Sequence, residues 1–126
     1  MMKQVIDWFE IPVSDLSRAE AFYNAVLETN LRRENYAGPT MQMAVFPGEG
    51  EAVKGALLAG HPALQVGARG TLVYLHAGTS MDTALQRVTD AGGQVTTGKV
   101  TLPEGLGYMA HILDLDGNCV GLHTYA

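Results

Sequence analysis

The chain has 126 residues and a net charge of −5, with 47% hydrophobic and 17% charged residues. These values are typical of one soluble globular domain, which we place at residues 1–126. The eight Lys and Arg residues are scattered except for Arg32-Arg33. An acidic chain without a basic face is a poor partner for nucleic acid or for an anionic membrane surface.

The sequence carries no sign of a membrane segment or a disulfide framework. No stretch approaches the ~20 apolar residues that span a bilayer, and the opening MMKQVIDWFE holds no apolar run of the signal-peptide kind. The single Cys119 excludes an intrachain disulfide and a zinc finger, and we expect it to be a small buried hydrophobe within a strand. We therefore expect a cytoplasmic protein with no membrane partner.

The first half of the chain predicts a strand, a helix and further short strands. Residues 5–13 (VIDWFEIPV) are rich in β-branched and aromatic residues, which favours a strand. Residues 14–30 carry an apolar stripe at helical spacing, with Ser14 or Asp15 as the N-cap. Residues 31–60 hold short strands: YAGPTMQMAVF, broken at its Gly-Pro, and then VKGALLAG.

The second half repeats this order after a polar, Gly-bearing connector at residues 61–70 (HPALQVGARG). Thr79 and Asp82 have the spacing of a capping box at the start of the second helix, and Gly92-Gly93 favours its end. The predicted elements are a strand at 71–77, a helix at 79–91, a strand at 94–100 and a hairpin at 108–126 around Asp116-Gly117-Asn118.

Strand, helix and strands thus occur twice with similar lengths, which favours a duplicated βαβββ unit. Module one would cover about residues 1–60, the connector 61–70, and module two about 71–126. Neither module would cover its own sheet alone, and the connector allows them to pair within one chain or between two chains.

The chain resembles the glyoxalase/bleomycin resistance/dioxygenase superfamily, also called the vicinal oxygen chelate superfamily. The resemblance lies in three stretches: WFEIPVSDLSRAEAFYNAVL, GTLVYLHAGTSMDTALQRVTDAGGQV and GYMAHILDLDGNCVGLHTYA. It implies an α+β fold in which two βαβββ modules form a U-shaped, eight-stranded mixed sheet with helices on the convex face, and it implies a homodimer. It also implies one of several roles: metal-assisted isomerase, dioxygenase, thiol transferase or metal-free drug binder.

The resemblance assigns the family's metal ligands to four strand positions. Here those positions fall on Trp8, Leu72, Gly121 and a residue near Gly55. None of these side chains can coordinate a divalent metal, which needs carboxylate or imidazole donors. We therefore expect no metal at the family's usual site and no other cofactor.

Strand alternation indicates which residues share the cleft with these positions. Apolar walls with a few polar groups are typical of a small-molecule site, and Arg32, Arg33 or Arg69 could reach its rim. The predicted ligand-binding residues are Trp8, Glu10, Leu72, Tyr74, His76, Met109, His111 and His123, with Cys119 on the same face.

Glu10 is the most informative of these residues, because Phe9 and Ile11 flank it in mid-strand. A carboxylate there is costly unless it is paired or solvated. It either pairs with His76 or His123 for structural reasons, or it acts as a general base or ligand anchor. Glu10 and His123 are therefore the catalytic candidates, and an off-pattern metal site of Glu10, His76, His111 and His123 is an alternative.

Three functions remain open from the sequence. The first is a metal-independent small-molecule-binding protein of unknown ligand, of the glyoxalase/bleomycin resistance type. The second is a lyase, isomerase or dioxygenase-type enzyme with an off-pattern metal or an acid–base site around Glu10 and His123. The third is an inert dimerisation module whose cleft is filled by Trp8 packed on Met109.

Overall fold

The computed structural model describes residues 5–35, 40–50 and 52–126. Part of the strand predicted in the stretch YAGPTMQMAVF, residues 36–39, lies outside the described residues. The elements are β1 (Trp8–Pro12), α1 (Leu16–Leu27), β2 (Arg32–Glu34), β3 (Gln42–Val45), β4 (Lys54–Ala59), β5 (Tyr74–His76), α2 (Met81–Asp90), β6 (Gln94–Thr101), a 3-10 turn (Pro103–Gly105), β7 (Tyr108–Leu113) and β8 (Cys119–Thr124).

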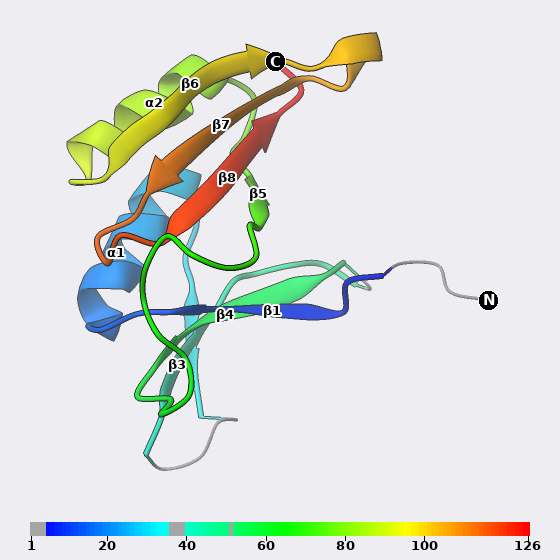
Figure 1. The fold of residues 1–126 in the computed structure, drawn as a ribbon. Helices are drawn as coiled ribbons and strands as arrows, with labels where there is room; N and C mark the ends of the chain where they lie inside the picture. The colour runs from blue at the N-terminus through cyan, green and yellow to red at the C-terminus, as the bar shows by residue number, and fades with distance from the viewer. Residues whose placement is uncertain (1–4, 36–39, 51) are drawn as a thin grey trace.

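The strands form two mixed sheets of four strands each, with the orders β1-β4-β3-β2 and β5-β8-β7-β6. In each sheet the first strand runs parallel to the last strand of its module, and the remaining pairs are antiparallel. The predicted α+β fold of two βαβββ modules is confirmed, with its eight strands divided between two sheets (Figure 1).

Both helices begin at a side-chain cap. The Asp15 carboxylate accepts a hydrogen bond of 3.1 Å from the amide of Arg18, as predicted for α1. The cap of α2 is Ser80, whose hydroxyl accepts from the amide of Thr83 at 3.3 Å. The predicted capping box from Thr79 is wrong by one position, because it is Ser80 that adopts the extended backbone of an N-cap.

One apolar core joins the two modules, because α1 packs against α2 while each helix also covers its own sheet. Alternation along the strands directs every second side chain into this core. In β1 the core residues are Phe9 and Ile11, and in β8 they are Val120 and Leu122. We call the opposite side of each sheet its open face.

The open face of the first sheet has an apolar cluster of its own. Met43, Val45, Ala56 and Leu58 are buried there, with Met41 packed against them. The open face of the second sheet is more polar, since it carries the side chains that the sequence placed in a cleft. They are Tyr74, His76, Met109, His111, Cys119 and His123.

Polar bridges fix the modules to each other within the chain. The Tyr23 hydroxyl donates to Asp114 Oδ2 at 2.7 Å, and Asn118 Nδ2 donates to the carbonyl of Pro12 at 2.7 Å. Arg87 Nε donates to the carbonyl of Val26 at 2.8 Å. Each bond joins residues far apart in sequence, so the docking of the modules is specified by more than apolar contact.

Neither helix in the described part of the chain has the length and apolarity needed to cross a membrane.

Candidate functional site

A row of polar side chains crosses the open face of the second sheet. Tyr74 in β5 and His111 in β7 both pair with Gly121 in the strand between them. The Tyr74 hydroxyl lies 2.7 Å from His111 Nε2 and donates to Met109 Sδ at 3.4 Å. His111 Nδ1 lies 3.3 Å from the hydroxyl of Thr97 in β6. We call Tyr74, His111 and Thr97 the tyrosine–histidine row.

Gly121 is what allows this row to form. A Cβ atom at position 121 would lie 2.4 Å from the nearest atom of the Tyr74 ring, which is closer than real contacts allow. The ring therefore lies across the glycine to reach His111. Tyr74 remains 46% exposed, so one side of its ring is open to solvent or to a ligand.

The other two predicted histidines pair with each other along the same sheet, His76 in β5 with His123 in β8. His123 Nε2 donates to the carbonyl of Leu106 at 2.6 Å, and its ring meets that of Tyr125 edge-on at 4.7 Å. The bond to Leu106 gives His123 a structural role, because it ties β8 to the loop that follows β6.

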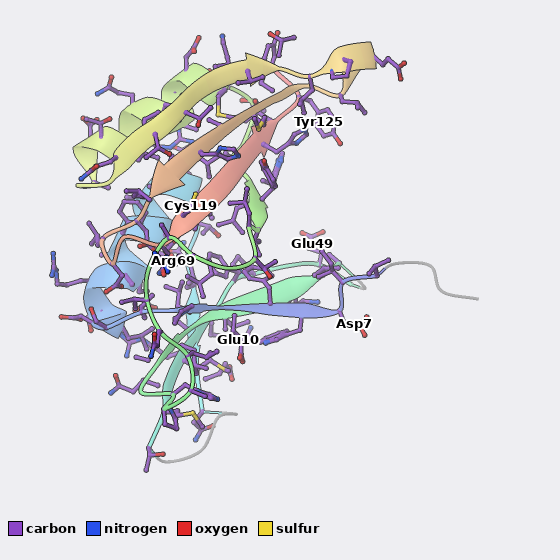
Figure 2. The ribbon with its side chains drawn as sticks, in the orientation of Figure 1. Asp7, Glu10, Glu49, Arg69, Cys119 and Tyr125 are labelled. Atoms are coloured by element: carbon purple, nitrogen blue, oxygen red, sulfur yellow. The ribbon has the colours of Figure 1, made fainter. Side chains whose placement is uncertain are left out.

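Glu10 takes a different partner from the one that the sequence suggested. Trp8 Nε1 donates to Glu10 Oε2 at 3.3 Å on the open face of the first sheet. Among the described residues no hydrogen bond or ion pair joins Glu10 to a histidine. Figure 2 shows Glu10 projecting from β1 on the side away from Cys119. The catalytic candidates Glu10 and His123 are thus not brought together.

The metal-ligand positions also lack donors in three dimensions. Glu10 pairs with Ala56 in β4 as Tyr74 pairs with Gly121 in β8, so the first-module counterpart of Gly121 is Ala56. This agrees with the expected position near Gly55; Gly55 itself is not the counterpart, because a side chain there would point at the ring of Phe9 in the core. Ala56, like glycine, has no ligating atom.

The off-pattern metal site is not assembled either. Within the described ranges, no three His, Cys, Asp or Glu side chains gather closely enough to hold a metal ion. The set of Glu10, His76, His111 and His123 is divided between the two sheets and among different partners. The described residues of this set therefore do not form a divalent-metal site.

A cavity of about 320 Å³ lies where β1, the connector and the start of β8 meet. We call it the connector pocket. Of the predicted ligand-binding residues, Glu10, Leu72 and His111 line it, together with Arg69 and Cys119. Figure 2 shows Arg69 close to the start of β8, where Cys119 lies.

A second, more apolar cavity of about 690 Å³ lies between β1, the end of α1 and β5. The predicted residues Leu72, Tyr74 and His76 line it, and Phe9 and Phe46 contribute its floor. The remaining predicted residues line neither of these two cavities. They are Trp8, Met109 and His123.

Sequence reasoning overlooked Asn118, which is 5% exposed and holds the connector in place. Its Oδ1 accepts from the amide of Gly67 at 2.8 Å, while its Nδ2 donates to Pro12 and Asp114. The Asp-Gly-Asn turn is the available signal. Its sequence predicts the backbone conformation of the turn, but not the hydrogen-bond partners of the Asn118 amide group.

Comparison with known proteins identifies the family. The model of the Glyoxalase/Bleomycin resistance protein/Dioxygenase superfamily matches residues 5–122. The chain belongs to this superfamily. A comparison with curated protein sequences gives no match.

Solved structures of the superfamily have the same fold. A glyoxalase/bleomycin resistance protein from Streptomyces sp. CB03234 is 26% identical, with a TM-score of 0.67 over 95% of this chain and 100% of that one. TnmS3, an antibiotic binding protein from the same strain, is 25% identical, with a TM-score of 0.66 over 98% of both chains. The fosfomycin resistance protein FosX from Listeria monocytogenes shares the fold at 15% identity, with a TM-score of 0.66 over 98% of this chain and 94% of its own.

Proposed function

We propose that this superfamily member is a metal-independent, cytoplasmic protein that binds a small organic molecule. The observation that carries the proposal is the Tyr74 ring lying across Gly121. The family resemblance places a metal ligand at position 121, and here an aromatic ring bonded to His111 takes that space. The similarity to TnmS3, an antibiotic binding protein, supports a binding role.

The proposed ligand surface is the open face of the second sheet together with Trp8 and Glu10 of the first sheet. Exposed aromatic and imidazole rings offer flat apolar contact together with a few hydrogen-bonding groups, which is the usual make-up of a small-molecule site. The proposed contact residues are Trp8, Glu10, Leu72, Tyr74, His76, Met109, His111 and His123.

We also propose a homodimer, because apolar side chains are exposed along two strand edges. In the described chain β1 pairs with β4 and β5 pairs with β8, so each has one free edge. Trp8 is 41% exposed in β1, Tyr74 is 46% exposed in β5, and Leu72 just before β5 is 36% exposed. A second copy would cover such edges.

Two measurements on the purified protein test the binding proposal. Elemental analysis should find transition metals far below one per chain, and a chelator should not change the melting temperature. In a thermal-shift panel of apolar and aromatic compounds, a compound at 100 times its Kd stabilises the protein by about 2.7 kcal/mol. Tyr74→Ala should abolish that shift, while Tyr125→Ala at the exposed end of the chain keeps it.

If elemental analysis finds one transition metal per chain and the metal is lost in His111→Ala, the metal-independent proposal is wrong. A panel without any shift, repeated with chemically diverse compounds, would favour the inert dimerisation module.

An acid–base enzyme of the lyase or isomerase kind is the second candidate, and the contact between Tyr74 and His111 favours it. A phenol 2.7 Å from an imidazole can pass a proton to or from a bound carbonyl compound. This pair replaces the centre around Glu10 and His123 that the sequence suggested. Mass spectrometry of the binding compounds after incubation separates the candidates, because a binding protein returns them unchanged.

A further inference from the structure

The connector pocket contains a positive charge that forms no ion pair with another described residue. Among the described residues, the ion pairs join Arg32 to Glu34, Arg33 to Glu20, Arg87 to Glu28 and Lys99 to Asp82. Arg69, which lines the pocket, belongs to none of them. The pocket's one carboxylate, Glu10, accepts a hydrogen bond from the indole of Trp8 and forms no ion pair with Arg69.

The rest of the lining is suited to an organic molecule. Leu72 and Val73 give it an apolar wall, and Cys119 and His111 lie on its β7–β8 side. A volume of about 320 Å³ is at the lower end of the range for small-molecule sites. The lining therefore combines apolar surface with one guanidinium and with the Glu10 carboxylate, which is already bonded to Trp8.

The connector segment that carries Arg69 is held in position by hydrogen bonds in the absence of a ligand. Asn118 bonds the amide of Gly67, two residues before Arg69, and is itself anchored to Pro12 and Asp114. A site formed in advance loses less conformational entropy on binding. The arginine is thus carried by a segment bonded to Asn118, and Asn118 is itself bonded to Pro12 in the first module.

We propose that the connector pocket binds a small organic molecule bearing a carboxylate, with Arg69 pairing its two oxygens. This inference rests on the proposed binding function and names the chemical class of the ligand. The planar guanidinium matches a carboxylate in a bidentate arrangement, and such charge-assisted hydrogen bonds are stronger than neutral ones. The apolar body of the ligand lies against Leu72, which is 36% exposed.

Cys119 is a built-in reporter for this site, since it is the single cysteine and is half-buried in the pocket wall. Its thiolate displaces iodide from iodoacetate or iodoacetamide, forming a thioether and releasing the iodide ion. The reagents differ in that iodoacetate carries a carboxylate and iodoacetamide is neutral. The ratio of their rate constants, normalised to N-acetylcysteine, therefore measures attraction of a carboxylate.

We expect the rate constant for iodoacetate divided by that for iodoacetamide to be higher for the protein than for N-acetylcysteine, in spite of the net charge of −5. Arg69→Gln should lower the ratio about tenfold, as the loss of one charged hydrogen-bonding group implies. Arg18→Gln is the matched control, because Arg18 also forms no ion pair with a described residue and lies outside the pocket. Its ratio should equal that of the unmodified protein.

A protection assay tests binding itself. Benzoate should slow the alkylation of Cys119 by iodoacetamide, and benzyl alcohol, its neutral analogue, should not. Arg69→Gln should remove the benzoate protection. The iodoacetamide rate without benzoate checks that the substitution has not opened the pocket, because opening would accelerate that rate.

An unchanged ratio in Arg69→Gln, or equal protection by benzoate and benzyl alcohol, would overturn the carboxylate proposal. These results would leave the proposed binding function untouched, since that function is tested at Tyr74 with a neutral compound panel. Loss of the Tyr74-dependent shifts with the Arg69 effect intact would instead overturn the binding surface and keep the pocket.

Discussion

Tyr23 shows how a single polar atom is accommodated in the shared core. The residue is fully buried, and its hydroxyl donates to Asp114 Oδ2 at 2.7 Å across the two modules. Burial raises the pKa of the Tyr23 phenol well above 10.0, and the neighbouring Asp114 carboxylate raises it further. The phenol therefore stays protonated and keeps its bond at any pH the protein normally meets.

Removing this hydroxyl should cost stability. Tyr23→Phe leaves the buried Asp114 carboxylate with one donor fewer, so we expect a loss of about 1–3 kcal/mol in the free energy of unfolding. Urea denaturation followed by circular dichroism measures it. Tyr125→Phe removes the same atom from a side chain that is 71% exposed, and it should change stability by less than about 0.5 kcal/mol.

The raised pKa of Tyr23 also predicts an alkaline dependence. The phenol loses its proton more easily in the unfolded chain, so its contribution is fully present below pH 10 and decreases as the pH rises above that value. The decrease approaches about 1.4 kcal/mol per pH unit. Unfolding curves at pH 9 to 11 should therefore converge for the unmodified protein and Tyr23→Phe; parallel curves would contradict this linkage.

At the scale of the elements, Gly121 decides the surface of the second sheet. Gly121→Ala places a Cβ against the Tyr74 ring, which has to leave and break its contact with His111. We expect a destabilisation of about 1–3 kcal/mol, as for other overpacked sites. Gly98→Ala in β6 is the control, because its Cβ would meet nothing within 4 Å.

The double variant Tyr74→Ala/Gly121→Ala isolates the clash between the two residues. Without the ring, the added methyl group has room, so the double variant should be about as stable as Tyr74→Ala alone. The melting temperatures of the unmodified protein, Tyr74→Ala, Gly121→Ala and the double variant measure the coupling between the two residues. Fully additive losses would mean that Tyr74 does not lie on Gly121 in solution.

Strand alternation predicted this surface only in part. It placed Tyr74 and His111 together on the cleft face, and the structure puts both on the open face of the second sheet. Alternation is a local property of extended backbone, so one sequence suffices to see it. The contact between Tyr74 and His111 depends on the register of three strands, which no local pattern contains.

At the scale of the whole molecule, the sequence could not show which residues the modules bring together. Strand alternation puts Glu10 and His123 on the cleft face of the single sheet that the sequence predicts, and a carboxylate in mid-strand needs a partner. The structure gives each module its own sheet and joins them through α1 and α2. That docking depends on buried tertiary bonds such as those of Tyr23 and Asn118.

The same docking leaves the edges of β1 and β5 uncovered in the chain as described, so the final prediction concerns a second copy. Light scattering after gel filtration should give the mass of a dimer. Leu72→Glu should shift it toward the monomer, because a charge would enter an apolar contact between edges. Leu64→Glu is the control: Leu64 is 39% exposed and Leu72 36%, but Leu64 lies in the connector and is part of neither strand. A monomeric starting protein would contradict the dimer, and equal effects of the two substitutions would move the interface away from these edges.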